Sequence, residues 1–282
     1  MKFITSPIWS YLSLHGVKRP NQKGNASVAQ QLKRGPVTGT AIRPERKKAP
    51  FLVEFYRSAV AKKWIMAITG LMLMGFVFFH MIGNLKMYLG KTPAGVYHID
   101  EYGEFLRELL VPILPRTVTL WLLRFGLIGA FALHIQSAYA LTMINKRARP
   151  IKYQSKRDYV AASFASRTMR YTGSIFLAFL LWHLADFTMG WVNRGYVRGE
   201  VYRNVGASLS YAPVALIYIV GNLALGVHLY HGSWSLFQSL GINNPRFNKA
   251  RRLFATGFAS LIVVGNLSFV FAWLFRILKK AA

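Results

Sequence analysis

Four histidines, His80, His134, His183 and His228, lie singly in four different hydrophobic segments of the chain. An ionisable side chain is costly to place in a bilayer, so a histidine inside a membrane segment indicates a functional role. Imidazole nitrogens can relay protons, bind metal ions and act as axial ligands of haem iron. Which of these chemistries is available depends on which histidines lie at the same depth.

The hydrophobic segments are long enough to be transmembrane helices. The chain of 282 residues is 53% hydrophobic and 16% charged, which is typical of an integral membrane protein. About 20 apolar residues cross the hydrocarbon core as a helix, and the segments lack the alternation of a membrane β-barrel. We therefore predict an all-α fold, a bundle of five transmembrane helices at about residues 64–89, 118–144, 168–192, 211–240 and 253–277.

Basic residues gather on one side of these predicted spans. Thirteen Lys and Arg precede Trp64 against two acids, residues 145–170 hold eight against one acid, and residues 246–252 add four. The positive-inside rule then places the N-terminus in the cytoplasm and the C-terminus outside. Topology thus accounts for the net charge of +27, which argues against nucleic acid as a partner.

Two segments are predicted to lie outside the bilayer. Residues 1–50 are polar, basic and rich in Gly, Pro, Ser and Asn, so we predict a flexible N-terminal arm before a membrane domain at residues 51–282. Apolar residues from Ile99 to Ile113 repeat at helical spacing with acids opposite. This pattern predicts an amphipathic helix on the outer membrane surface, closed by Pro112 and Pro115.

The direction of each span assigns a depth to each histidine. His80 and His183 lie six and about ten residues before the outer ends of outward-running spans, which is about 9 and 15 Å. His134 and His228 lie eighteen and seventeen residues past the outer starts of inward-running spans, which is about 25 Å. His80 and His183 therefore share an outer level, and His134 and His228 share an inner level.

Two level-matched pairs favour two b haems, each with bis-histidine ligation of its iron. Zinc would need three or four ligands at one level. The absence of cysteine excludes cysteine-ligated iron–sulfur clusters, c-type haem and disulfides within this chain. The alternative is that the histidines are hydrogen-bonded structural residues or proton relays.

A short internal repeat accompanies the pairs. Gly70 follows Thr69 and precedes His80 by ten residues, and Gly173 follows Thr172 and precedes His183 by ten. Ten residues of helix is about 15 Å, so both glycines are expected near the inner level, where a flat macrocycle could lie against the helix backbone. Ordinary small-residue helix packing is the alternative.

Further polar residues are candidates for supporting roles. His231 lies one turn beyond His228 and is the reserve ligand, or a partner for a haem propionate or a quinone carbonyl. Arg124 lies near the outer level and can pair with a propionate or with Asp186. At the inner rim, Lys63, Arg167 and Arg170 can meet propionates or lipid headgroups. Residues that could line a quinone pocket there are Trp64, His231, Trp234, Ser235 and Gln238, although the Trp residues equally suit interfacial anchors.

Three stretches of the chain resemble the cytochrome b membrane subunit of succinate dehydrogenases and fumarate reductases, in its single-chain, five-helix, two-haem type. The similarity covers about residues 55–278. The stretches are Lys62-Lys63…Thr69-Gly70…His80…Gly83-Asn84, Thr172-Gly173…Trp182-His183, and the most specific, His228-Leu-Tyr-His231-Gly232-Ser-Trp234-Ser235-Leu-Phe-Gln238-Ser-Leu-Gly241.

The resemblance implies a redox role in a bacterial inner membrane. It implies a cytoplasmic flavoprotein subunit with FAD and the dicarboxylate site, an iron–sulfur subunit, and a quinone, usually menaquinone, that exchanges electrons through two haem b groups. His134 and His228 would hold the inner haem, and His80 and His183 the outer one. Some members carry a glutamate two residues before the inner ligand. Here that residue is Gly226, which argues against proton transfer at this position.

Two other functions fit the same residues. One is a cytochrome b anchor of a different dehydrogenase. The other is a haem-free transporter with histidine proton relays, which would favour broken helices and an inverted repeat. The residues do not specify the direction of catalysis, the quinone, whether the complex forms a higher oligomer, or whether His228 or His231 is the inner ligand.

Overall fold

The computed structural model describes residues 50–148, 164–242 and 244–279, and these are overwhelmingly helical. Helices account for 80% of them, and the described residues contain no β-strand, only one isolated antiparallel bridge between Lys91 and Tyr97. The predicted all-α class is confirmed for this part of the chain. The predicted N-terminal arm, apart from Pro50, lies outside the described residues.

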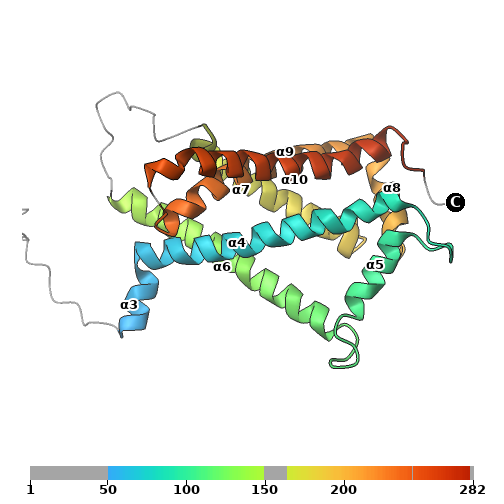
Figure 1. The fold of residues 1–282 in the computed structure, drawn as a ribbon, viewed down its shortest axis with the longest axis horizontal. Helices are drawn as coiled ribbons and strands as arrows, with labels where there is room; N and C mark the ends of the chain where they lie inside the picture. Colours follow the sequence, from blue (N-terminus) through green and yellow to red (C-terminus); the bar gives the residue numbers. More distant parts are fainter. Residues whose placement is uncertain (1–49, 149–163, 243, 280–282) are drawn as a thin grey trace, which may run out of the picture. The chain divides into compact units, whose positions relative to one another are not determined.

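The helices follow the order of the predicted spans (Figure 1). Short helices and 3-10 or π turns (η) lie between the long ones. In chain order they are α3 (Phe51–Arg57), α4 (Ala59–Asn84), η2 (Leu85–Leu89), α5 (His98–Arg107), α6 (Val118–Ala148), α7 (Phe164–His183), η4 (Leu184–Thr188), α8 (Val201–Leu209), α9 (Ala212–Ser239), η5 (Pro245–Phe247) and α10 (Asn248–Leu274).

Four helical segments are long and apolar enough to cross a membrane: Ala59–Leu89, Val118–Ala148, Ala212–Ser239 and Pro245–Leu274. Each has 28 to 31 residues, which at about 1.5 Å per residue exceeds the hydrocarbon thickness. They indicate a multi-pass membrane protein. The fifth predicted span is helical as α7 and η4 but is not among the four, and α7 carries Arg167, Arg170 and His183 within its 20 residues.

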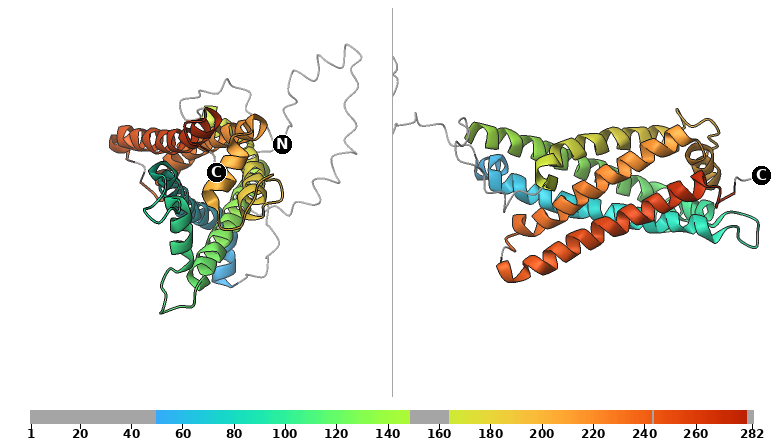
Figure 2. Two further views of the ribbon diagram at one scale, coloured as in Figure 1. Left: turned by 90° about the vertical axis from the view of Figure 1, so that its right-hand side faces the viewer. Right: turned by 90° about the horizontal axis from the view of Figure 1, so that it is seen from above.

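The long helices pack as two adjacent antiparallel pairs, α4 with α6 and α7 with α9, and α10 lies along the other side of α9 (Figure 2). Small residues on α9 permit its close contacts. A methyl group added at Gly221 would come 2.3 Å from Cγ of Phe179 on α7, and one at Gly226 would come 2.3 Å from Cγ2 of Val263 on α10. Helix α10 therefore leaves no room for a glutamate side chain at position 226.

The fit at Gly226 makes a testable prediction about stability. Gly226→Ala is expected to lower the free energy of unfolding by about 1–3 kcal/mol, because Val263 must move away. Gly75→Ala is the matched control, since no atom lies within 4 Å of the added methyl group. Removing a helical glycine there is expected to be neutral or slightly stabilising. Thermal unfolding of both variants in detergent measures the difference, and equal midpoints would contradict the packing argument.

The far ends of α4 and α10 are joined by α5 and α8. The rings of Tyr97 and Tyr202 stack with centroids 3.6 Å apart, and Tyr202 also lies edge-on to Trp273, at 5.0 Å. The backbone N–H of Tyr202 donates to Asp100, at 2.9 Å. These contacts connect the start of α5 with α8 and the end of α10. Helix α5 ends at Arg107, earlier than the amphipathic pattern predicted, and its position on a membrane surface stays a prediction.

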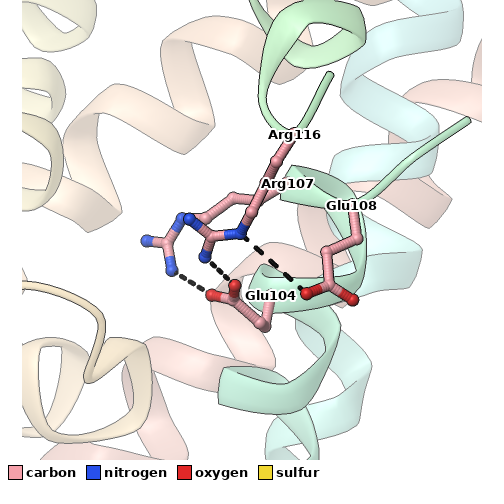
Figure 3. A network of polar contacts seen from close by, with 4 residues as sticks. All are labelled: Glu104, Arg107, Glu108 and Arg116. Carbon is pink, nitrogen blue, oxygen red and sulfur yellow. Dashed lines mark hydrogen bonds and ion pairs between the residues drawn. The ribbon is translucent and has the colours of Figure 1, made fainter. Parts of the chain in front are cut away.

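Acidic side chains of α5 pair with arginines close to them in sequence. Glu104 accepts hydrogen bonds from Arg107, at 2.6 Å, and from Arg116, while Glu108 lies 3.9 Å from Arg116 (Figure 3). The four groups thus bind the end of α5 to the turn before α6. All four side chains are at least one-third exposed, so the network contributes little to global stability.

Asp100 makes the stability of this end dependent on pH. Burial raises the pKa of its carboxyl above the ordinary value of about 3.9, and the hydrogen bond from Tyr202 offsets part of the rise. Since the folded state then binds this proton more tightly than the unfolded state, the contribution of Asp100 to stability falls as the pH rises between the two pKa values. Asp100→Asn is expected to flatten that part of the profile. Unfolding midpoints between about pH 3.5 and 7 test this, and parallel profiles would contradict it.

Candidate functional site

The structure brings the four span histidines together as two pairs from four helices. His80 on α4 lies beside His183 at the end of α7, with ring centroids 5.9 Å apart. His134 on α6 lies beside His228 on α9, with centroids 6.4 Å apart. These are the two pairs that the span directions predicted. Each of the four residues keeps part of its surface accessible, so packing does not close off either pair.

The two predicted glycines lie against the inner histidines. A methyl group added at Gly70 would come 3.4 Å from Cε1 of His134, and one at Gly173 would come 3.3 Å from Cε1 of His228. In both cases the next nearest atom is Nδ1 of the same ring. In the structure the imidazole of an inner histidine lies at each of these two glycines. Contact of a flat macrocycle with the helix backbone there stays a prediction.

Hydrogen bonding near His134 indicates how its ring nitrogens are used. The Thr69 hydroxyl donates to the Ile65 carbonyl at 2.6 Å, and its oxygen lies 3.2 Å from Nδ1 of His134, where it can accept an N–H. Nε2 would then carry the free lone pair. In His228, Nδ1 is buried. In both rings the Nδ1 side faces the glycine helix, which makes Nε2 the nitrogen available to a ligand.

The spacing of the pairs fits a shared ion. An imidazole nitrogen lies about 2 Å from a bound metal and about 1 Å from its own ring centre, so two rings on opposite sides of one ion have centroids about 6 Å apart. Ordinary aromatic pairs also have centroids within about 4.5–7 Å of each other, so the distance alone does not identify a ligand pair. The two inner histidines differ from an ordinary pair because each also lies against a glycine of a neighbouring helix. No cluster of three or more His, Asp or Glu residues suited to a metal exists within the described part of the chain. Each pair supplies two imidazole donors, which is the number that a bis-histidine haem would use.

Aromatic rings surround the outer pair. Phe76, one turn before His80 on α4, stacks on the His80 ring with centroids 5.3 Å apart. The rings around His183 have centroids between 5.4 and 6.0 Å from it and belong to Phe179, Phe187 and Tyr218. Such an apolar environment would keep water away from a cofactor between the two histidines.

A buried carboxylate lies behind His183. Asp186 is fully buried in the π-helix η4, and its oxygens accept hydrogen bonds from the Ser208 hydroxyl at 2.6 and 2.7 Å and from the Tyr218 hydroxyl at 2.8 Å. The Tyr218 oxygen also lies 3.5 Å from Nδ1 of His183. Single π turns in helices often occur at functional sites. Ser208 and Tyr218 were missed by the sequence reasoning, which had singled out Asp186 alone.

The predicted alternative, an ion pair between Arg124 and Asp186, is wrong. Its guanidinium lies over the Trp121 ring, 4.9 Å from the centroid, and the residue is exposed. Ser208 and Tyr218 take the place of a cation at Asp186 because both hydroxyls come from neighbouring helices that already contact η4. The pairing of Arg124 with a haem propionate stays a prediction.

Four of the predicted quinone residues, His231, Trp234, Ser235 and Gln238, follow one another at helical spacing on α9, and the fifth lies on α4; their role at a quinone stays a prediction. Trp64 is 48% exposed on α4. Trp234 lies under the guanidinium of Arg251, at 5.0 Å, and the Ser235 hydroxyl donates to the Gly232 carbonyl. Gln238 is exposed and His231 half-buried.

Ring contacts among the described residues place His228, and not His231, beside His134. The Lys63 and Arg170 side chains make no ion pair with a described acid; that of Arg167 lies outside the described set.

No family model matches the chain, and no curated protein or solved structure is significantly similar to it. Function is therefore inferred from the residues and their geometry.

Proposed function

We propose that this chain is the cytochrome b membrane-anchor subunit of a bacterial succinate:quinone oxidoreductase. In this role it relays electrons between an iron–sulfur subunit and a membrane quinone. One observation carries the proposal: four histidines from four helices meet as two pairs, and each inner histidine lies against a glycine of the neighbouring helix. The motifs that resemble the family contain His80, His183 and His228 with both glycines, and His134 lies between the first two motifs.

The residues divide into ligands and groups that orient them. His80 and His183 are assigned to an outer haem b, and His134 and His228 to an inner one, through Nε2 where Nδ1 faces the glycine helix. Bound haem would supply reversible one-electron transfer. Thr69 orients His134, and Tyr218 with Asp186 orients His183, because a hydrogen bond to Nδ1 fixes the tautomer of a ligating imidazole.

The proposed arrangement in the membrane follows from charge. We assign α7 with η4 as a fifth span that runs in the same direction as α4, from the cytoplasm outward. The N-terminus is then cytoplasmic, the C-terminus lies outside, and α5 lies on the outer surface. The basic cytoplasmic face is suited to dock the iron–sulfur subunit, which in turn carries the FAD-containing flavoprotein.

The quinone assignment rests on residues at the cytoplasmic rim. Menaquinone is the proposed redox partner, near the inner haem, with its pocket formed by Trp64, His231, Trp234, Ser235 and Gln238. Transfer of protons across the membrane by a carboxylate at the position of Gly226 is not part of the proposal, because Val263 already occupies that space.

A pyridine haemochrome assay on the purified protein tests the proposal. Two b haems per chain with low-spin, bis-histidine spectra are expected. Reduction of these haems by succinate, or their oxidation by fumarate, in the intact complex would separate this function from that of an anchor for another dehydrogenase. A protein purified without haem, which also fails to bind added haem, would overturn the proposal and favour a transporter.

A further inference from the structure

A pocket of about 440 Å³ lies where α3, the start of α4 and the end of α6 meet. It is distinct from both histidine pairs. Its walls combine cationic groups with aromatic and aliphatic side chains. The lining residues are Tyr56, Arg57, Lys62, Gln136, Tyr139, Ala140, Met143, Ile144 and Arg147.

The most unusual of these residues is Lys62, which is only 4% exposed. Its ammonium group donates to the Gln136 side chain at 3.2 Å and lies 3.3 Å from the centroid of the Tyr56 ring. These contacts use one of its three N–H donors and leave its charge without an anion. A buried cation is costly unless an opposite charge or further acceptors accompany it.

Two arginines add to this positive charge. Arg57 ends α3, and Arg147 lies in the last turn of α6. No carboxylate lines the pocket, and none of its three cations forms an ion pair with any acid among the described residues. The pocket therefore has the electrostatic character of an anion site.

The pocket faces away from the histidines. On α6, Gln136 lies two residues from His134, which is about 200° around the helix, and Ala140, Met143 and Arg147 follow on the same side as Gln136. The pocket-lining residues of α6 therefore lie on the other side of that helix from His134, and none of the four span histidines lines the pocket. Neither a haem propionate nor an electron carrier is favoured by that location.

Helix α3 indicates which environment the pocket meets. Its apolar side chains point outward: Phe51 is 77% exposed, Leu52 75% and Phe55 49%. The Ser58 hydroxyl accepts a hydrogen bond from the Ala61 N–H and starts α4 immediately afterwards. Exposed apolar residues at the start of a membrane span are typical of a segment in contact with lipid.

We propose that this pocket binds an anionic phospholipid, with Arg57, Lys62 and Arg147 on its phosphate and the acyl chains along Ala140, Met143 and Ile144. Basic pockets between membrane helices at a bilayer surface recognise anionic lipid headgroups by this combination of charge and apolar wall. The proposal does not depend on haem binding, because it uses the opposite side of α6.

The test compares lipid retained by two double variants of the full chain, purified with any copurifying subunits. Arg57→Gln with Arg147→Gln removes two cations of the pocket, and Lys249→Gln with Arg252→Gln on α10 removes two exposed cations elsewhere. Each cation at a membrane surface contributes about fivefold to anionic-lipid affinity, so the first pair is expected to weaken binding by about 30-fold and the control to leave it unchanged. Mass spectrometry of bound lipid after extensive detergent washing provides the first readout.

Thermal unfolding with added ligands identifies the source of the anion. Mixed micelles of detergent and phosphatidylglycerol are expected to raise the unfolding midpoint of the wild-type protein but not that of the pocket variant. Mixed micelles with phosphatidylcholine, and inorganic phosphate, are expected to have no such effect. Equal lipid retention in the two double variants would overturn the proposal. An equal rise with inorganic phosphate or with phosphatidylcholine would also overturn it. Haem content is expected to be the same in all these proteins.

Discussion

His228→Ala is expected to remove one of two haems from the purified protein and leave the other bound. The lost group is the inner one, because His228 lies beside His134 and both outer ligands come from other helices. The haem-to-protein ratio should therefore fall by about half, because a haem that loses one of its two histidine ligands is held less tightly by the protein and is no longer low-spin. Reduction of quinone should slow severely for the same reason. Haemochrome assay and reduced-minus-oxidised spectra measure both changes.

His231→Ala is the matched control for this variant. His231 lies on the same helix, three residues further along and half-buried, but makes no ring contact with His134 among the described residues. It is expected to retain both haems. The reverse outcome would move the inner ligand to His231. Loss of both haems from each single histidine variant would contradict the separation into an outer and an inner pair.

Trp273→Ala is expected to cause the largest loss of stability in the described fold. Trp273 is 1% exposed at the end of α10, where it lies against Tyr202, and its ring atoms come within 2.7 Å of where a methyl group on Gly206 would be. Emptying such a site costs about 3–5 kcal/mol for Trp to Ala, from lost burial and the cavity left behind. The expected result is a clearly lower unfolding midpoint in detergent, together with loosened α8.

Trp191→Ala provides the comparison, because the residue type is the same and the side chain is 78% exposed. In detergent it is expected to change the midpoint little. Protease sensitivity of the segment between α7 and α9 should increase in the Trp273 variant alone. Equal midpoints for the two variants would show that α8 does not depend on this contact for its stability.

The pairing of the histidines could be predicted from sequence because helical rise is nearly constant. Counting residues from the span ends gives a depth, and two spans that run in the same direction place histidines with similar counts at similar levels. His80 with His183, and His134 with His228, follow from this geometry without knowledge of side-chain packing. The helix boundaries of α4, α6, α9 and α10 were predictable for a similar reason, since long apolar runs have few alternative structures.

Contacts between distant segments could not be predicted in this way. Ser208 and Tyr218 reach Asp186 from α8 and α9, and nothing in the local pattern around residue 208 indicates such a role. Asp186 was one of two anions predicted for Arg124, because a charge in a span requires a partner, whereas the structure places the Arg124 guanidinium over the Trp121 ring. The pocket around Lys62 was also missed, since it requires the tertiary packing of α3 and of α6 against α4.

The two glycine–histidine contacts divide the membrane domain into two similar halves. The hairpin of α4 and α6 contributes His80 and His134 with Gly70, and the hairpin of α7 and α9 contributes His183 and His228 with Gly173. Each pair thus takes one histidine from each hairpin, so under the proposed ligation neither hairpin alone could hold either haem. Haem would then bind only after the two hairpins have associated. A protein that contains haem would therefore also have completed the assembly of its membrane helices.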